Sequence, residues 1–150
     1  MRVDRHTRQP DTQTFSAAVP TWLRLVRAFH KIEHALTAQL RCDELSMAQF
    51  DVLAQVGHAE GMMQQELADR LQVTKGNVCQ LLDRMARDGI VERRQDGRAN
   101  RLYLTETGHR LYEQMVPTHE AEIARLLAAL TPDEQRQLGR LLRKLDRSLS

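Results

Sequence analysis

The stretch from Gln64 to Leu104, QQELADRLQVTKGNVCQLLDRMARDGIVERRQDGRANRLYL, decides the fold, because two helical patterns and two short strand patterns follow one another in it without a long linker. Residues 64–71 predict a short helix, and two further residues leave room only for a tight connection. Thr74 is a favoured N-cap for a second helix from Lys75 to Arg87, and Gly89 is suited to end that helix. This spacing is typical of a helix-turn-helix.

A small basic hairpin comes directly after the second helix. Residues 90–93 and 101–104 read as two short strands around a turn at Asp96 and Gly97. The chain as a whole is nearly neutral, with 22 Lys and Arg against 20 Asp and Glu, so any basic surface must be local. Four arginines concentrate that charge on the hairpin: Arg93, Arg94, Arg98 and Arg101. Together with the helix pair, the hairpin indicates a winged helix-turn-helix.

The rest of the sequence is helical in pattern. Aromatic residues make up only 4% of the chain, and leucine, methionine and alanine carry the hydrophobic content, which favours helices over sheets. Apolar periodicity and capping signals predict further helices over residues 19–40, 46–57, 106–130 and 132–148. We therefore predict a mainly α fold of six helices with a two-stranded β-wing. It would form a single domain over residues 19–150, preceded by a flexible tail over residues 1–18.

Composition argues against several other classes of protein. No apolar run approaches the length of a membrane span, and residues 1–18 lack the apolar core of a signal peptide, so a reducing cytoplasm is the simplest location. The sequence has no glycine-rich phosphate loop, no Ser/His/Asp order that suggests a triad and no carboxylate cluster. We therefore predict neither an enzyme nor a bound cofactor.

The helix over residues 75–87 has one polar side. Amides and a lysine occupy that side near the start of the helix, where base edges are read in the major groove. Such a side could also be an ordinary solvated helix face. The preceding short helix and the following basic hairpin favour DNA recognition.

Two motifs resemble the multiple-antibiotic-resistance regulator (MarR) family of bacterial transcription factors. The first is the run from Leu67 to Arg94, LADRLQVTKGNVCQLLDRMARDGIVERR. The second is Asp96-Gly-Arg98 followed by Leu104-Thr-Glu-Thr-Gly108, which is similar to the family's wing signature. The hairpin here lacks the few residues, often including a proline, that the family usually carries before the aspartate, so a short wing is expected.

The resemblance implies a homodimeric repressor that binds a pseudo-palindromic operator in double-stranded DNA. The helices over about 19–40 and 106–148 would dimerise, and a lobe over about 46–105 would bind one half-site. We expect Arg98 to enter the minor groove and Asp96 to orient its guanidinium, while the other wing arginines meet phosphates or brace the hairpin. The DNA-binding residues predicted on these grounds are Thr74, Lys75, Gly76, Asn77, Gln80, Arg84, Arg93, Arg94, Asp96, Arg98 and Arg101.

The resemblance also implies a pocket for a small-molecule effector, for example an aromatic acid, between the dimer interface and the DNA-binding lobe. The residues near the junction of the first two helices are the candidates for lining it: Trp22, Phe29, His30, Met47 and Phe50. Ordinary core packing is the alternative role for most of them.

Other sensing mechanisms remain as alternatives. His30 and His34 lie four residues apart and could share a metal ion, but no further ligands stand at a matching spacing, so no metal site is predicted. Cys42 or Cys79 could respond to oxidants if nearby positive charge lowered its pKa. A helical interaction module that does not bind DNA would explain the amphipathic helices but not the wing signature.

Overall fold

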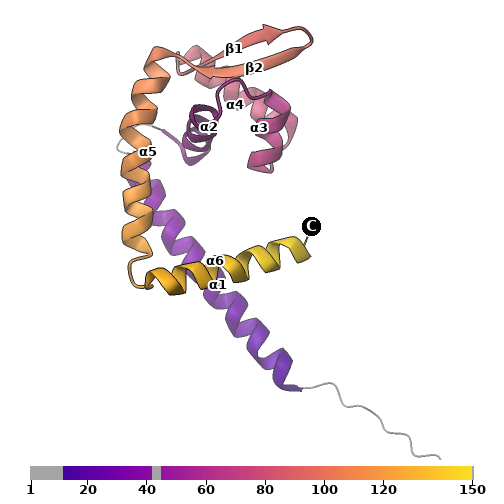
Figure 1. The fold of residues 1–150 in the computed structure, drawn as a ribbon, viewed down its shortest axis with the longest axis vertical. Coiled ribbons are helices and arrows are strands. Elements are labelled where there is room, and N and C mark those ends of the chain that lie inside the picture. The colour runs from indigo at the N-terminus through magenta and orange to yellow at the C-terminus, as the bar shows by residue number, and fades with distance from the viewer. Residues whose placement is uncertain (1–11, 42–44, 150) are drawn as a thin grey trace, which may run out of the picture. The chain divides into compact units, whose positions relative to one another are not determined.

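The computed structural model describes residues 12–41 and 45–149. Within these residues the chain forms six helices and one two-stranded antiparallel sheet (Figure 1). Their order is α1 (Thr12–Arg41), α2 (Met47–His58), α3 (Gln64–Leu71), α4 (Lys75–Arg87), β1 (Val91–Asp96), β2 (Ala99–Leu104), α5 (Glu106–Leu126) and α6 (Pro132–Ser148). The predicted order of elements, and the bounds of α3, α4 and α6, are confirmed.

Helix α1 begins seven residues before its predicted start. Residues 12–18, which we predicted as part of a flexible tail, are helical, and Pro20 lies inside the helix instead of in its first turn. We placed the start of the helix near Pro20 because proline is common in a first helical turn. Proline can also occur further inside a helix, so its position did not mark the start. Beside the proline, the Thr21 hydroxyl donates a hydrogen bond to the Ala17 carbonyl at 2.7 Å.

The chain divides into two compact units, with the boundary in the sequence between Ala35 and Leu36. Most of α1 forms the first unit, and its last residues belong to the second. Leu36 and Leu40 are buried there, which anchors the end of the helix in the core of the second unit.

That core is built from the apolar sides of the short helices and of the hairpin. Helix α2 starts at a capping box, in which the Gln49 N–H donates to the Ser46 hydroxyl at 3.2 Å and the Ser46 N–H donates to the Gln49 amide oxygen at 3.0 Å. Helix α5 adds the buried Met115. Besides Leu40, the fully buried side chains come from α2, α3, α4 and β2: Val52, Leu53, Val56, Leu67, Val78, Leu82, Met85 and Leu102. Alternation in β2 places Leu102 and Leu104 on the buried side of the sheet.

The two strands of the hairpin are longer than predicted, although β1 begins at Val91 and not at Ile90. Its pairs run from Val91 with Leu104 to Asp96 with Ala99, so only Gly97 and Arg98 form the turn. Residues 61–63 flank β2 on its other edge: the Gly61 N–H donates to the Leu102 carbonyl at 2.8 Å, and the Leu102 N–H donates to the Met62 carbonyl at 2.9 Å. The wing is therefore tied to the segment that leads into α3.

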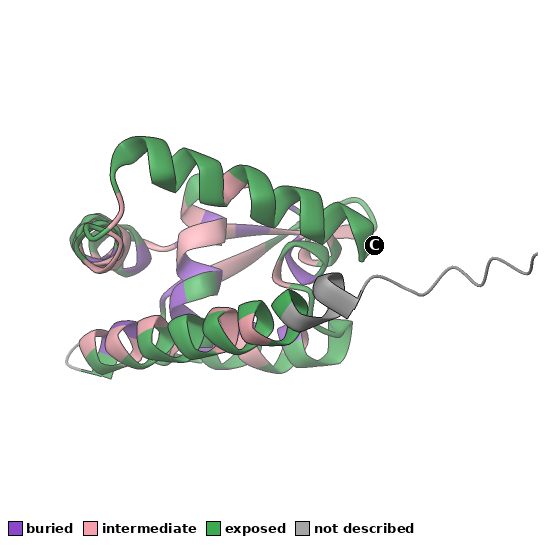
Figure 2. Ribbon diagram, turned by 90° about the horizontal axis from the view of Figure 1, so that it is seen from below, coloured by how far each residue is buried: buried purple, intermediate pink, exposed green. Residues whose placement is uncertain are grey.

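Helices α5 and α6 are separated by a short turn after Leu126, so α5 ends four residues before its predicted end. Helix α6 has no buried residue, and Figure 2 shows it exposed along its length. Four leucines of α6, each 38–58% exposed, form one apolar stripe: Leu138, Leu141, Leu142 and Leu145. Leu149, just beyond the helix end, is 78% exposed. In the first unit, Val19, Trp22, Leu23 and Phe29 are similarly exposed.

Candidate nucleic-acid interface

Helix α4 turns its polar side to solvent. It begins at the predicted cap, where the Asn77 N–H donates to the Thr74 hydroxyl at 3.2 Å. Gln72 takes a left-handed conformation with φ 53°, which closes the turn between α3 and α4. The apolar side of α4 is buried, and the exposed side holds the predicted residues Thr74, Lys75, Gly76, Asn77, Gln80 and Arg84.

Two of the wing arginines are paired with carboxylates of the wing itself. Arg94 and Arg101 are direct partners across the two strands, where like charges would repel. Arg94 donates to the Glu92 carboxylate at 2.8 Å, and its guanidinium carbon lies 4.2 Å from the centre of the Tyr103 ring. Arg101 donates to the Asp96 carboxylate at 2.6 Å, and this hydrogen bond raises the pKa of Arg101 above its usual value. The two carboxylates thus offset the repulsion between the paired cations.

Arg93 is held on the opposite face of the hairpin. Its Nη1 donates to the Asp83 carboxylate at 2.6 Å and its Nη2 to the Cys79 carbonyl at 3.2 Å. Both acceptors lie on α4. Of the two roles predicted for this arginine, these contacts favour the brace.

Arg98 is exposed in the two-residue turn at the tip, where Gly97 has φ 60°. The described residues offer it no hydrogen bond or ion pair. The expectation that Asp96 orients Arg98 is wrong in this structure, because Asp96 bonds to Arg101. Asp96 and Arg101 are diagonal neighbours on one face of the sheet, whereas Arg98 lies beyond the last pair.

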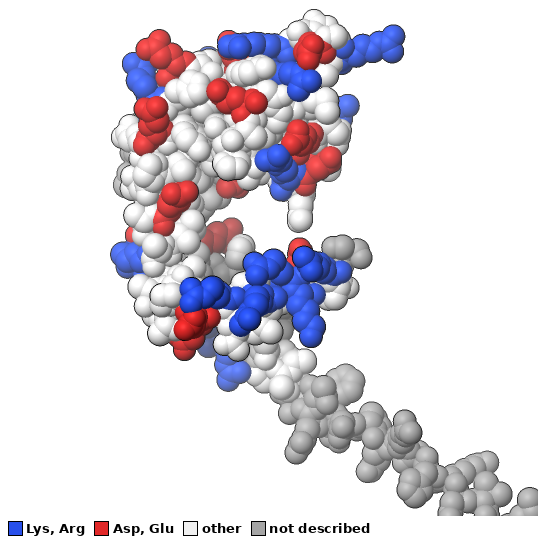
Figure 3. All heavy atoms as spheres, in the orientation of Figure 1, with Lys and Arg blue, Asp and Glu red and all other residues white. Residues whose placement is uncertain are grey.

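Lys75 and Arg98, far apart in the sequence, line one surface hollow. Its remaining lining comes from the start of α3 and the tip of the wing: Met63, Gln64, Gln65, Ala99 and Asn100. Figure 3 shows Lys and Arg side chains projecting around the end of the hairpin, and a second basic area over α6. The start of α4 and the tip of the wing therefore each contribute one cationic side chain to the same hollow.

Two residues with clear roles near this surface could not be singled out by the sequence analysis. The sequence pattern marks Asp83 only as one more outward polar residue, although it holds Arg93. The Glu60 carboxylate accepts a hydrogen bond from the Leu104 N–H at 2.9 Å and lies 3.2 Å from His109 Nε2, so it links the base of the wing to α5. A single carboxylate in a loop carries no motif that would have revealed this link.

The predicted effector residues fall into the two units. Trp22, Phe29 and His30 are exposed on α1 in the first unit. Met47 is half-buried in the second, and Phe50 is buried there with its ring centre 4.1 Å from that of His119. Phe50 thus has the core role that was the alternative.

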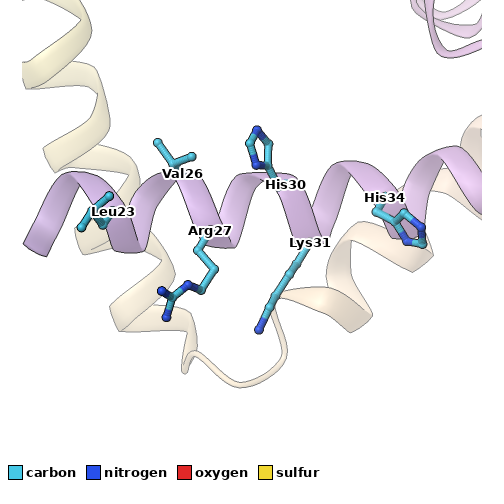
Figure 4. A pocket seen from close by; sticks show the side chains of 6 residues that line it. All are labelled: Leu23, Val26, Arg27, His30, Lys31 and His34. Carbon is cyan, nitrogen blue, oxygen red and sulfur yellow. The ribbon is translucent and has the colours of Figure 1, made fainter.

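A surface hollow lies along α1, and Figure 4 shows the side chains that line it. All six of its lining residues come from one helix: Leu23, Val26, Arg27, His30, Lys31 and His34. A hollow formed by a single helix encloses nothing by itself.

The structure adds no support for metal sensing or redox sensing among the residues it describes. No group of three or more His, Cys, Asp or Glu side chains that could hold a metal ion occurs among residues 12–41 and 45–149. Cys42 lies outside those residues, and Cys79 is a half-buried free thiol on α4. In the same part of the chain, no helix is both long and apolar enough to cross a membrane.

Two helices joined by a tight turn, with an exposed polar recognition face and a basic hairpin beside it, define a winged helix-turn-helix. A family model described as MarR family matches residues 44–101. An HTH-type transcriptional regulator of Bacillus cereus is 32% identical over 125 residues, which cover 83% of this chain and 85% of the relative. The HTH-type transcriptional repressor YetL of Bacillus subtilis is 29% identical over 140 residues, covering 90% and 84%.

Solved structures agree with the sequence relatives. A point mutant of E. coli MarR complexed with operator DNA is 28% identical, with a TM-score of 0.77, and the match covers 87% of this chain and 96% of that one. The Mycobacterium tuberculosis MarR family protein Rv2887, in complex with salicylic acid, is 29% identical with a TM-score of 0.63, covering 81% and 92%. The chain belongs to the MarR family of transcriptional regulators.

Proposed function

We propose that this regulator is a repressor that reads duplex DNA with α4 in the major groove and the wing tip in the neighbouring minor groove. The observation that carries the proposal is the shared hollow of Lys75 and Arg98, which presents two free cations beside the exposed amides of α4. In this arrangement Asn77 and Gln80 meet base edges, and Lys75 meets phosphate. The operator complex of E. coli MarR and the repressor YetL support the same assignment.

We also propose that two copies act together. The leucine stripe of α6 is exposed along its length, and a folded protein seldom leaves such a stripe open to water. Covering it with a second copy would make the terminal helices the dimerisation region and leave residues 46–105 as the DNA-binding lobe. Two lobes related by a twofold axis fit a pseudo-palindromic operator.

The test compares binding to two duplexes of equal length. One carries the promoter region of the gene that encodes this protein, and the other has a random sequence. We expect tighter binding to the promoter duplex and, in both cases, a steep loss of affinity with salt. In sedimentation the protein should be a dimer at micromolar concentration. Equal, salt-independent affinity for both duplexes, or a stable folded monomer, would contradict the proposal.

An effector that releases the DNA is the remaining part of the proposal. The salicylic acid complex of Rv2887 supports an aromatic acid as its chemical class. Thermal melts with salicylate, compared with the matched non-aromatic cyclohexanecarboxylate, would test this. A bound acid should raise the melting temperature with concentration and weaken promoter binding; no shift at millimolar salicylate would count against that class. A regulator of chromosomal DNA would act in the bacterial cytoplasm.

A further inference from the structure

Arg93 occupies a strand position where an apolar side chain would be expected. It shares one face of β1 with the buried Val91, and its partner across the hairpin is Leu102, which is fully buried. Only 25% of the Arg93 side chain remains exposed. An arginine at such a position needs a structural partner, because burying an unpaired cation is costly.

The partner is one turn of the recognition helix. Asp83 and Cys79 are four residues apart on α4, and the two ends of the Arg93 guanidinium donate to the carboxylate of the first and the carbonyl of the second. Arg93 Nε is buried and has no hydrogen-bond partner. Within residues 12–41 and 45–149, these are the only side-chain hydrogen bonds between the hairpin and α4.

Asp83 itself lies on the side of α4 that carries the DNA-reading residues, and half of its side chain is exposed. A free carboxylate at that place would repel phosphate. The Arg93 guanidinium neutralises the Asp83 carboxylate by pairing with it, and the same contacts connect the wing to α4.

We propose that Arg93 is a positioning residue that fixes the wing against the recognition helix and masks the charge of Asp83, without itself touching DNA. This inference rests on the proposed DNA binding. It separates Arg93 from Arg98: both lie on the hairpin, but only Arg98 is free to meet DNA. It also assigns Asp83 a role, because the Asp83 carboxylate accepts the hydrogen bond that holds Arg93 in place.

The test compares Arg93→Met, which keeps most of the buried stem, with Asp83→Ala and with the double variant. We expect Arg93→Met to weaken promoter binding about tenfold, because it loosens the wing and unmasks the aspartate. The affinity of the double variant for the promoter should be within about threefold of that of Asp83→Ala, because the unpaired Asp83 carboxylate is no longer present. The salt slope of the double variant should equal that of the wild type. Arg93→Lys keeps the charge but lacks the planar fork, so its promoter affinity should lie between those of the wild type and Arg93→Met.

A direct contact of Arg93 with phosphate predicts the opposite pattern. The double variant would then bind as weakly as Arg93→Met, and its log–log salt slope would fall by about 0.9 per subunit. That result would overturn the proposal.

A measurement without DNA separates this inference from the proposed function. In hydrogen exchange of the free dimer, Arg93→Met should speed the exchange of the hairpin amides. The matched control is Arg94→Met, because Arg94 is the next residue and bonds only within the wing. Equal exchange in both variants would refute the brace even if the wild type binds DNA. Faster exchange in Arg93→Met alone, in a protein that fails to bind any duplex, would support the brace and refute the proposed function.

Discussion

Replacing Arg98 with alanine should weaken DNA binding without disturbing the folded protein. The side chain is exposed in the turn and makes no hydrogen bond or ion pair with the described residues, so its removal breaks nothing in the free state. Gly97, which supplies the left-handed φ that the tight turn needs, is untouched. We therefore expect the melting temperature and the oligomeric state to remain unchanged.

The magnitude follows from counting charges. One phosphate neutralised by each subunit of the proposed dimer contributes roughly 2 × 0.9, or about 1.8, to the slope of log affinity against log salt concentration. Between about 50 and about 200 mM salt, that difference in slope corresponds to roughly a twelvefold change in the ratio of wild-type to variant affinity. The difference in affinity between the wild type and the variant should therefore shrink as the salt concentration rises.

The assay is a salt titration of promoter-duplex binding with two matched variants. Arg98→Lys keeps the charge but not the planar fork, so it should keep the slope and recover part of the affinity. Arg94→Ala removes an equal charge from the same hairpin, but that arginine is held by Glu92, so its slope should stay near wild type. If Arg98→Ala shows the wild-type slope, the short wing does not reach DNA, and the role assigned to its tip must be abandoned.

Three further predictions concern the core, pH and base recognition. Gly108→Ala should destabilise the protein by about 1–3 kcal/mol in thermal or urea unfolding, because its Cβ would overlap the Ile90 carbonyl oxygen at the start of the wing. Gly139→Ala, whose Cβ would meet nothing nearer than a side-chain nitrogen at 3.8 Å, should instead stabilise α6 by up to about 1 kcal/mol; equal effects would contradict the packing argument. Burial lowers the pKa of His119, so the unfolded chain binds a proton first, and stability should fall as pH drops below about 6.5, by at most about 1.4 kcal/mol per pH unit. His119→Gln should flatten that decline in thermal melts, and an unaltered pH profile would exclude His119 as its source. Asn77→Ala and Gln80→Ala should each lower discrimination among operator variants by about 1–3 kcal/mol in competition binding, and an unchanged ratio of specific to random affinity would mean that α4 is oriented differently.

Much of the lobe could be predicted from the sequence because its signals are local. The bounds of α3 and α4 follow from apolar spacing and from the Thr74 cap, and the capping hydrogen bond spans only three residues. The hairpin was recognisable for the same reason, although its strands extend further towards Gly97 than the pattern indicated. Such features depend on neighbours within one or two turns of the chain, which the sequence displays directly.

The roles of the four wing arginines could not be predicted in this way. All four have the same chemistry, and the sequence offers Asp96 equally to Arg98 and Arg101. The strand register assigns it to Arg101, and the packing of the sheet on α4 assigns Arg93 to Asp83. Of the four, Arg98 alone is left with its charge unused by the described residues.

The same limit applies to the apolar residues. Phe50 and the leucines of α6 look alike in a periodic pattern, yet Phe50 is buried against His119 and the leucines are exposed. Amphipathic spacing states that a face needs a partner but not which surface supplies it. The sequence by itself determined the helices, the caps and the wing, because those depend on short-range hydrogen bonds and spacing. Only the tertiary structure decided which charges are paired and which apolar faces are covered, because those depend on residues brought together from distant parts of the chain.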